Sequence, residues 1–144
     1  FTFTRDILAQ KTIKVFNNGQ MERDFTYIDD IVEAVVRLAV KPATAMEGWN
    51  SLAPDSSGSS APYRIYNIGN NNPVSLGDFI DTIEKALGME AIKNYLPMQQ
   101  GDVKSTYADI DALVKEVDYQ PKTPLKFGIE RFVKWYLKYY GHAG

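Results

Sequence analysis

The sequence predicts an α/β domain in which helices alternate with short strands. Segments with apolar residues at helical spacing alternate with short β-branched and aromatic runs that stop at Gly, Asn or Pro. The length of 144 residues lies in the usual range of one compact domain with its own core. Polar residues gather in the connections, so we expect binding groups at the mouths of loops.

The chain is expected to begin with a helix and two strands. Residues 1–9 have helical spacing, and residues 13–16 form a β-branched and aromatic run followed by the turn signal Asn17-Asn18-Gly19. We expect the second strand over residues 24–28.

A helix should follow, because acids stand at its start and Pro42 marks its end. Asp29 or Asp30 is expected to be the N-cap. The spacing predicts an apolar face made of Ile31, Ala34, Val35, Leu38 and Ala39.

Residues 47–62 are predicted to form a flexible loop within the single domain 1–144, because Pro, Asp, Ser and Gly fill residues 54–60. Residues 63–68 are an aromatic and aliphatic run that ends at Gly69, which predicts a strand. The run carries few charges, as is typical of a strand inside a larger parallel sheet.

The next helix has both start and stop signals. Ser75 is expected to be its N-cap, Asp78 its capping-box acid and Gly88 its C-terminal stop. Its inward face is predicted to consist of Leu76, Phe79, Ile80, Ile83 and Leu87.

Shorter elements are expected after residue 90. A short segment over residues 91–96 precedes an irregular stretch that begins at Pro97, and Asp109 is expected to cap a short helix. Thr123 and Pro124 are suited to the cap and first turn of a terminal helix. That helix should turn inward Ile129, Phe132, Val133 and Tyr136.

Composition and charge exclude several classes of protein. A net charge of −2 argues against nucleic-acid binding, which needs clustered Lys and Arg, so any phosphate bound here should belong to a small ligand. The absence of cysteine excludes disulfides and thiolate metal sites. No apolar run approaches the ~20 residues that cross a bilayer, so we expect no membrane contact and a cytoplasmic location.

Three motifs carry a resemblance to a known family. They are Arg-Asp-Phe-Thr-Tyr-Ile-Asp-Asp at 23–30, Tyr-Asn-Ile-Gly-Asn at 66–70 and Gln-Gln-Gly-Asp-Val at 99–103. They resemble the carboxy-terminal part of the extended short-chain dehydrogenase/reductases, which are Rossmann-type enzymes, and among these the UDP-glucuronate 4-epimerases. The resemblance implies a fragment that forms the substrate-binding portion, with the N-terminal dinucleotide-binding part missing.

For the intact parent the resemblance implies an NAD-dependent isomerase. Such enzymes oxidise the sugar at C4, let the 4-keto sugar rotate and return the hydride to its other face. The implied ligands are UDP-glucuronate and UDP-galacturonate, and the implied assembly is a homodimer formed through the missing half. No cofactor is expected in the fragment itself.

Arg23 is the candidate for holding the diphosphate. A guanidinium donates paired, charge-assisted hydrogen bonds to phosphate oxygens. On spacing alone, a surface ion pair of Arg23 with Glu22 or Asp24 is the commoner arrangement, and only the surrounding motif favours the phosphate role.

Asp102 is the candidate for holding the ribose, because a carboxylate accepts two hydroxyl hydrogen bonds and Gly101 permits close approach. A turn aspartate that binds nearby amides is the alternative. Gln99 either donates to phosphate or stays solvated, and relatives that act on other sugars often have Arg near this place.

The backbone of Lys14, Val15 and Phe16 is the candidate for reading uracil. The edge of the base alternates donors and acceptors, as the edge of a strand does. The alternative is a plain strand with Phe16 in the core.

Other polar and aromatic residues receive structural interpretations. Asp29 and Asp30 are interpreted as complements of a helix start, so no metal is expected. His142 is interpreted as a tail residue or tag remnant. The aromatic run at residues 135–140 is interpreted as core and surface of the last helix.

The sequence contains no candidate catalytic or cofactor-binding residue. It has no glycine-rich turn that feeds a helix, and no Tyr is followed by Lys four residues later. The nearest pair, Tyr119 and Lys122, has the wrong spacing. The isolated piece is therefore expected to be catalytically inactive.

Two other functions stay open. The chain could be a self-standing binding or interaction module, although an unpaired strand at residues 63–68 would then expose an edge. The parent could also be a sugar-nucleotide dehydratase or decarboxylase, since this half mainly selects the nucleotide.

Overall fold

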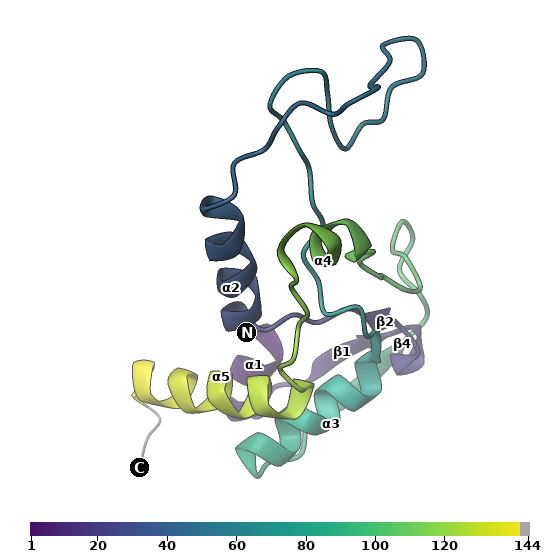
Figure 1. Cartoon of the computed structure of the whole chain (residues 1–144). Coiled ribbons are helices and arrows are strands. Elements are labelled where there is room, and N and C mark those ends of the chain that lie inside the picture. The colour runs from purple at the N-terminus through teal and green to yellow at the C-terminus, as the bar shows by residue number, and fades with distance from the viewer. Residues whose placement is uncertain (142–144) are drawn as a thin grey trace.

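A computed structural model describes residues 1–141 and confirms the α/β class (Figure 1). The elements in chain order are α1 (Thr2–Leu8), β1 (Ile13–Phe16), the short 3-10 turn η1 (Asn17–Gly19), β2 (Glu22–Arg23), α2 (Ile28–Ala39), β3 (Val74–Ser75), α3 (Leu76–Leu87), β4 (Lys93–Leu96), α4 (Asp111–Val117) and α5 (Leu125–Tyr139).

The strands form two small sheets. β1 and β4 are parallel, with Ile13 opposite Lys93 and Phe16 opposite Leu96. β2 and β3 are antiparallel, with Arg23 opposite Val74. Both sheets lie on the same side of the molecule, beside α3 (Figure 1).

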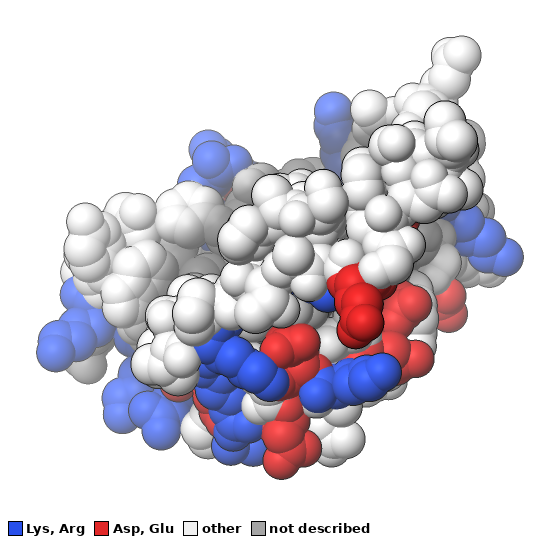
Figure 2. Space-filling model, turned by 45° about the horizontal axis from the view of Figure 1, so that its top comes forward, with Lys and Arg blue, Asp and Glu red and all other residues white. Residues whose placement is uncertain are grey.

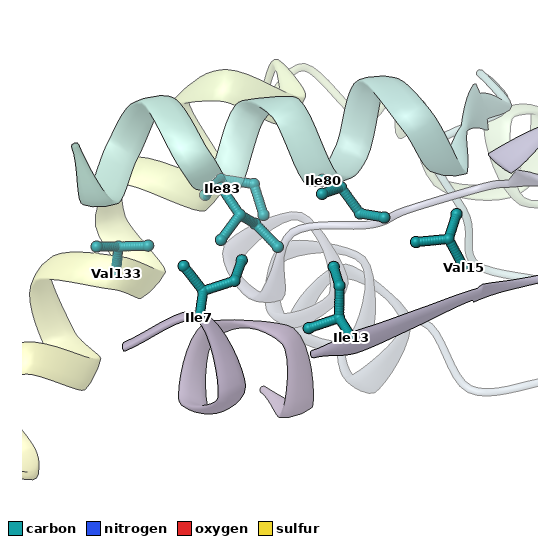
Figure 3. Close-up of a cluster of buried hydrophobic side chains, with 7 residues drawn as sticks. Ile7, Ile13, Val15, Ile80, Ile83 and Val133 are labelled. Atoms are coloured by element: carbon teal, nitrogen blue, oxygen red, sulfur yellow. The ribbon is translucent and has the colours of Figure 1, made fainter. Parts of the chain in front are cut away.

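The larger core lies between α3 on one side and α1 and β1 on the other, with α5 at its left end (Figure 3). The α1 and α3 side chains at its centre, Ile7, Ile80 and Ile83, are each 1% exposed. Complete burial of one such aliphatic side chain contributes about 1.5–3 kcal/mol. Its buried members are Ile7, Ile13, Val15, Ile80, Ile83, Ile129 and Val133.

A second, smaller core joins α2 to α4. Ala34, Leu113 and Tyr119 are fully buried in it. The buried carboxylate of Asp30 extends this connection, because it accepts hydrogen bonds from the backbone N–H groups of Lys122 (3.5 Å) and Thr123 (3.1 Å). The start of α2 is thereby tied to the segment that leads into α5.

The predicted signals of α3 are confirmed. The Ser75 hydroxyl accepts from the Asp78 N–H at 3.0 Å and donates to the Asp78 carboxylate at 2.7 Å. Gly88 ends the helix with φ 65°, a left-handed conformation that favours glycine. Ile80 and Ile83 are buried as expected.

The strand expected over residues 24–28 is wrong. β2 ends at Arg23, because the Asp24 N–H donates to the Thr106 hydroxyl at 3.2 Å, so a side chain takes the place of a strand partner. The N-cap of α2 is Tyr27, with no side-chain cap, where Asp29 or Asp30 was expected. Asp30 serves the 122–123 segment instead.

The strand expected over residues 63–68 is also wrong. Within the described chain, this stretch makes only an isolated bridge between Arg64 and Gly58. Residues 41–73 contain no helix or paired strand. The first part of this stretch extends away from the body of the molecule and the last part returns to it (Figure 1), where Tyr66 and Ile68 pack against the second core. The flexibility of residues 47–62 and the single-domain boundary 1–144 stay predictions.

The last two helices begin close to the expected places. α4 has Ile110 as its N-cap, while the Asp109 carboxylate accepts from the Asp111 N–H at 3.1 Å. α5 has Pro124 as its N-cap, one residue after the expected Thr123. His142 lies outside the described residues.

The surface charges are mixed. On the face shown in Figure 2, Lys and Arg (blue) alternate with Asp and Glu (red) in the lower part. Within residues 1–141, no helix combines the length and apolar character that a membrane span requires. The expected cytoplasmic location stays a prediction.

Candidate functional site

The candidate site is built around β2, which lies between two other segments. β3 pairs with β2 on one side. On the other side, the Glu22 N–H donates to the Lys104 carbonyl at 2.9 Å and the Thr106 N–H donates to the Glu22 carbonyl at 3.2 Å. Segments from distant parts of the sequence therefore meet beside Arg23.

Arg23 and Asp102 contact each other directly, although they are 79 residues apart. The Arg23 Nη2 donates to the Asp102 Oδ1 at 2.8 Å. Nη1 donates to the carbonyls of Glu22 (2.7 Å) and Lys104 (3.4 Å). The side chains are 24% and 34% exposed, so both charges remain accessible. A pairing of Arg23 with the carboxylate of Glu22 or Asp24 is not what the structure shows.

A cavity of about 490 Å³ lies next to this ion pair. Its walls come from α1, β1, β2 and the start of α3, and they include Lys14, Phe16, Arg23 and Asp102. Its volume lies in the range of small-molecule sites. We call it the nucleotide cavity below.

The edge of β1 has the orientation that base reading would need. The Ile13 N–H donates to the Ile92 carbonyl, so the backbone groups of Ile13 face β4. Backbone groups alternate along a strand, so those of Lys14 and Phe16 face the opposite edge. Val15 is buried in the core at 1% exposure, and its backbone groups face β4.

Gln99 is exposed and does not line the nucleotide cavity. Its carbonyl accepts from the Asp102 N–H at 3.2 Å and closes a turn. Gly101 has φ 82° in that turn, a conformation that favours glycine. The glycine therefore shapes the turn that presents Asp102.

A second cavity of about 550 Å³ lies between residues 25–28, α3 and α5. Its lining is mostly apolar and includes Phe25, which stacks on Phe79 with a centroid distance of 3.9 Å. Arg131 is the charged residue of this lining. We call it the apolar cavity, and sequence reasoning did not predict it.

The pKa of Tyr119 is shifted in the opposite direction to that of a catalytic tyrosine. Burial, followed by the charges of Asp30 and Glu33, raises the pKa of Tyr119 to about 12. A tyrosine base needs a lowered pKa, closer to the working pH. In residues 1–141, no three acidic or histidine side chains converge as metal ligands.

Sequence reasoning missed one polar residue of the site, Asp24. Its carboxylate accepts hydrogen bonds from the backbone N–H groups of Asn71, Asn72 and Ala108. Its place directly after Arg23 in a motif was the available signal.

Comparison with known proteins gives consistent matches. Residues 1–69 match the family model described as "NAD dependent epimerase/dehydratase family". Protein CapI of Staphylococcus aureus is 51% identical over 140 residues, covering 97% of this chain and 42% of that protein. A probable UDP-glucuronate 4-epimerase of Rhizobium meliloti is 42% identical, covering 99% of this chain and 42% of that protein.

A solved structure has the same fold. It is UDP-glucuronic acid 4-epimerase from Bacillus cereus in complex with UDP-glucuronic acid and NAD, with 28% identity and a TM-score of 0.69. The match covers 93% of this chain and 38% of that one. This chain thus spans about two fifths of the length of the curated relatives it matches, and it aligns with their C-terminal part.

Proposed function

Because the chain belongs to the NAD dependent epimerase/dehydratase family of extended short-chain dehydrogenase/reductases, we propose that it is the UDP-sugar-binding part of a UDP-glucuronate 4-epimerase. One observation carries the proposal: Arg23 and Asp102, 79 residues apart, are paired at the wall of one cavity. Residues that are distant in sequence converge there on a site with one cationic and one anionic group.

The chemistry of the two groups matches the two polar parts of UDP. The Arg23 guanidinium binds the diphosphate through charge-assisted hydrogen bonds. The Asp102 carboxylate accepts from the ribose hydroxyls. In the free site the two side chains satisfy each other at 2.8 Å, so the ligand exchanges an internal ion pair for two contacts of its own.

The edge of β1 that faces away from β4 supports the assignment of the base. Lys14 and Phe16 present backbone donors and acceptors away from β4, at the wall of the same cavity. Uracil pairs with such an edge as a neighbouring strand would. In this proposal Val15 only separates Lys14 from Phe16 along the strand, and Gln99 does not contact UDP.

The residues of this chain do not fit NAD. A dinucleotide needs a glycine-rich turn before a helix N-terminus that is free to receive a pyrophosphate. The first turn of α2 carries the acids Asp29 and Asp30, and that of α3 is filled by Ser75 and Asp78. In the proposed enzyme, NAD and the groups that move hydrogen belong to residues outside this sequence.

The exposed face of α2 supports the proposal that this chain works with a further polypeptide segment. Val32, Val35 and Val36 are 50–58% exposed on this helix. A row of exposed valines on one helix is a surface that proteins usually bury. We therefore propose that the 144 residues alone bind UDP but do not epimerise a UDP-sugar.

Calorimetric titration of the chain with UDP tests the proposal. Wild type should bind, and Arg23→Ala should weaken binding at least about tenfold, the loss expected from one charge-assisted contact. Arg131→Ala is the matched control, because Arg131 lines the apolar cavity instead. Unchanged affinity in Arg23→Ala, or loss in Arg131→Ala, would place the ligand elsewhere.

A further inference from the structure

We infer that Asp24 is a positioning residue of the nucleotide site, whose carboxylate holds the segment with Asp102 in place against Arg23. The inference rests on the proposed function of Arg23 and Asp102 as the two charged groups of a UDP site. It concerns a different side chain and a different kind of contact.

Three backbone amides from two distant segments converge on the Asp24 carboxylate. Oδ2 accepts from the N–H groups of Asn71 (3.1 Å) and Ala108 (3.2 Å), and Oδ1 accepts from the N–H of Asn72 (3.3 Å). The Asp24 N–H itself donates to the Thr106 hydroxyl at 3.2 Å. One half-buried carboxylate thus crosslinks both neighbours of β2.

This crosslink is needed because β2 is only two residues long. Residues 102–108 pair with it through the Glu22–Lys104 and Thr106–Glu22 backbone hydrogen bonds. The register of so short a pairing is weakly specified, and a slip would move Asp102 away from Arg23. The hydrogen bond from the Ala108 N–H to the Asp24 carboxylate follows these two backbone hydrogen bonds and fixes the register of the pairing.

The packing around Asp24 is tight on its other side. A Cβ atom on Gly69 would lie 2.2 Å from the Cβ of Ala108 and 2.8 Å from the Asp24 Oδ2. The added methyl group of Gly69→Ala would therefore clash with both Ala108 and the Asp24 carboxylate, without changing any charge. It provides a second, independent way to disturb the position of residues 102–108.

Asp30 provides a matched control for a purely structural carboxylate. It is 2% exposed and, like Asp24, accepts hydrogen bonds from backbone amides, those of Lys122 and Thr123. It does not line the nucleotide cavity. A change of Asp30 should lower stability without reaching Arg23.

The test compares the full 144-residue chain with Asp24→Asn, Gly69→Ala and Asp30→Asn. UDP affinity is measured by calorimetry, thermal unfolding by circular dichroism, and the Arg23 guanidinium signals by NMR without ligand. Asp24→Asn and Gly69→Ala should weaken UDP binding measurably, but by no more than Asp102→Asn does, and should shift the Arg23 signals. Asp30→Asn should lower the Tm and leave both other readouts unchanged.

A double variant separates positioning from stability. If Asp24 acts through Asp102, adding Asp24→Asn to Asp102→Asn should cost little further UDP affinity. Additive losses would overturn the inference, and so would unchanged Arg23 signals in a folded Asp24→Asn chain. If Asp24→Asn fails to fold, Gly69→Ala answers the same question.

The measurements distinguish a wrong positioning role of Asp24 from a wrong UDP site. Wild type that does not bind UDP, with Arg23 signals that shift in Asp24→Asn, refutes the UDP site and retains the positioning role. Wild type that binds UDP, with Asp24→Asn indistinguishable from it in affinity and Arg23 signals, refutes the positioning role alone.

Discussion

Replacing Asp102 by Asn should strengthen the binding of inorganic pyrophosphate and weaken the binding of uridine. In the free chain the Arg23 guanidinium is paired with the Asp102 carboxylate at 2.8 Å, so an incoming phosphate must first displace that carboxylate. The variant keeps the shape of the side chain and removes its charge. Arg23 is then available to an anion, while the ribose loses its charged acceptor.

The size of the effect follows from the exposure of the pair. At 24% and 34% side-chain exposure, water and salt screen the two charges, so the pair contributes about 1 kcal/mol. Pyrophosphate should then bind about fivefold tighter to Asp102→Asn. Uridine should bind about tenfold weaker, because a hydrogen bond to a charged group is replaced by a weaker one.

Calorimetric titrations with pyrophosphate and with uridine measure the two effects separately. Asp6→Asn is the matched control, because Asp6 lines the same cavity and pairs with Arg5, not with Arg23. A pyrophosphate affinity of Asp102→Asn no higher than that of wild type would show that Asp102 does not compete for Arg23. An equal gain in Asp6→Asn would contradict the prediction too, since that gain would come from net charge alone.

Two further predictions concern stability. The pKa of Tyr119 is raised from 10.0 to about 12, so the neutral form is favoured in the folded state, and the free energy of unfolding should fall by about 2–3 kcal/mol as pH rises from 10 to 12. Tyr119→Phe should flatten this pH dependence, which denaturant unfolding across the same range measures, and an unaltered pH profile would contradict the prediction. Below pH 10 the substitution should cost little stability, because the buried hydroxyl has no hydrogen-bond partner within residues 1–141. Ile83→Ala should lower the free energy of unfolding by about 2–5 kcal/mol, since Ile83 is 1% exposed. Ile65→Ala is the control, because Ile65 is 51% exposed and its loss should change the urea midpoint little. Equal shifts of the midpoint in the two variants would contradict the assignment of the core.

Elements specified by local signals were predictable from the sequence. α3 begins and ends where Ser75 and Gly88 place it, because an N-cap hydroxyl and a left-handed glycine act within a few residues. The failed strand over residues 63–68 shows the opposite case. Its β-propensity is real, but a strand exists only with a partner, and pairing is decided by distant segments.

The candidate site was only partly predictable for the same reason. Arg23 and Asp102 were identified as candidates through motif resemblance, and no local pattern shows that they contact each other across 79 residues. Asp30 was assigned to a helix cap because composition cannot distinguish a cap from a buried anchor for residues 122–123. Asp24 was considered only as a partner of Arg23, because its three amide donors come from other parts of the chain.

Mapping amide chemical shifts of the isotope-labelled chain during titration with UDP shows directly where the nucleotide binds. If UDP binds in the nucleotide cavity, saturable shifts will cluster at residues 12–16, at Arg23 and at residues 102–104. Shifts confined to residues 25–28 and α5, around the apolar cavity, or the absence of any saturable shift, would contradict binding in the nucleotide cavity.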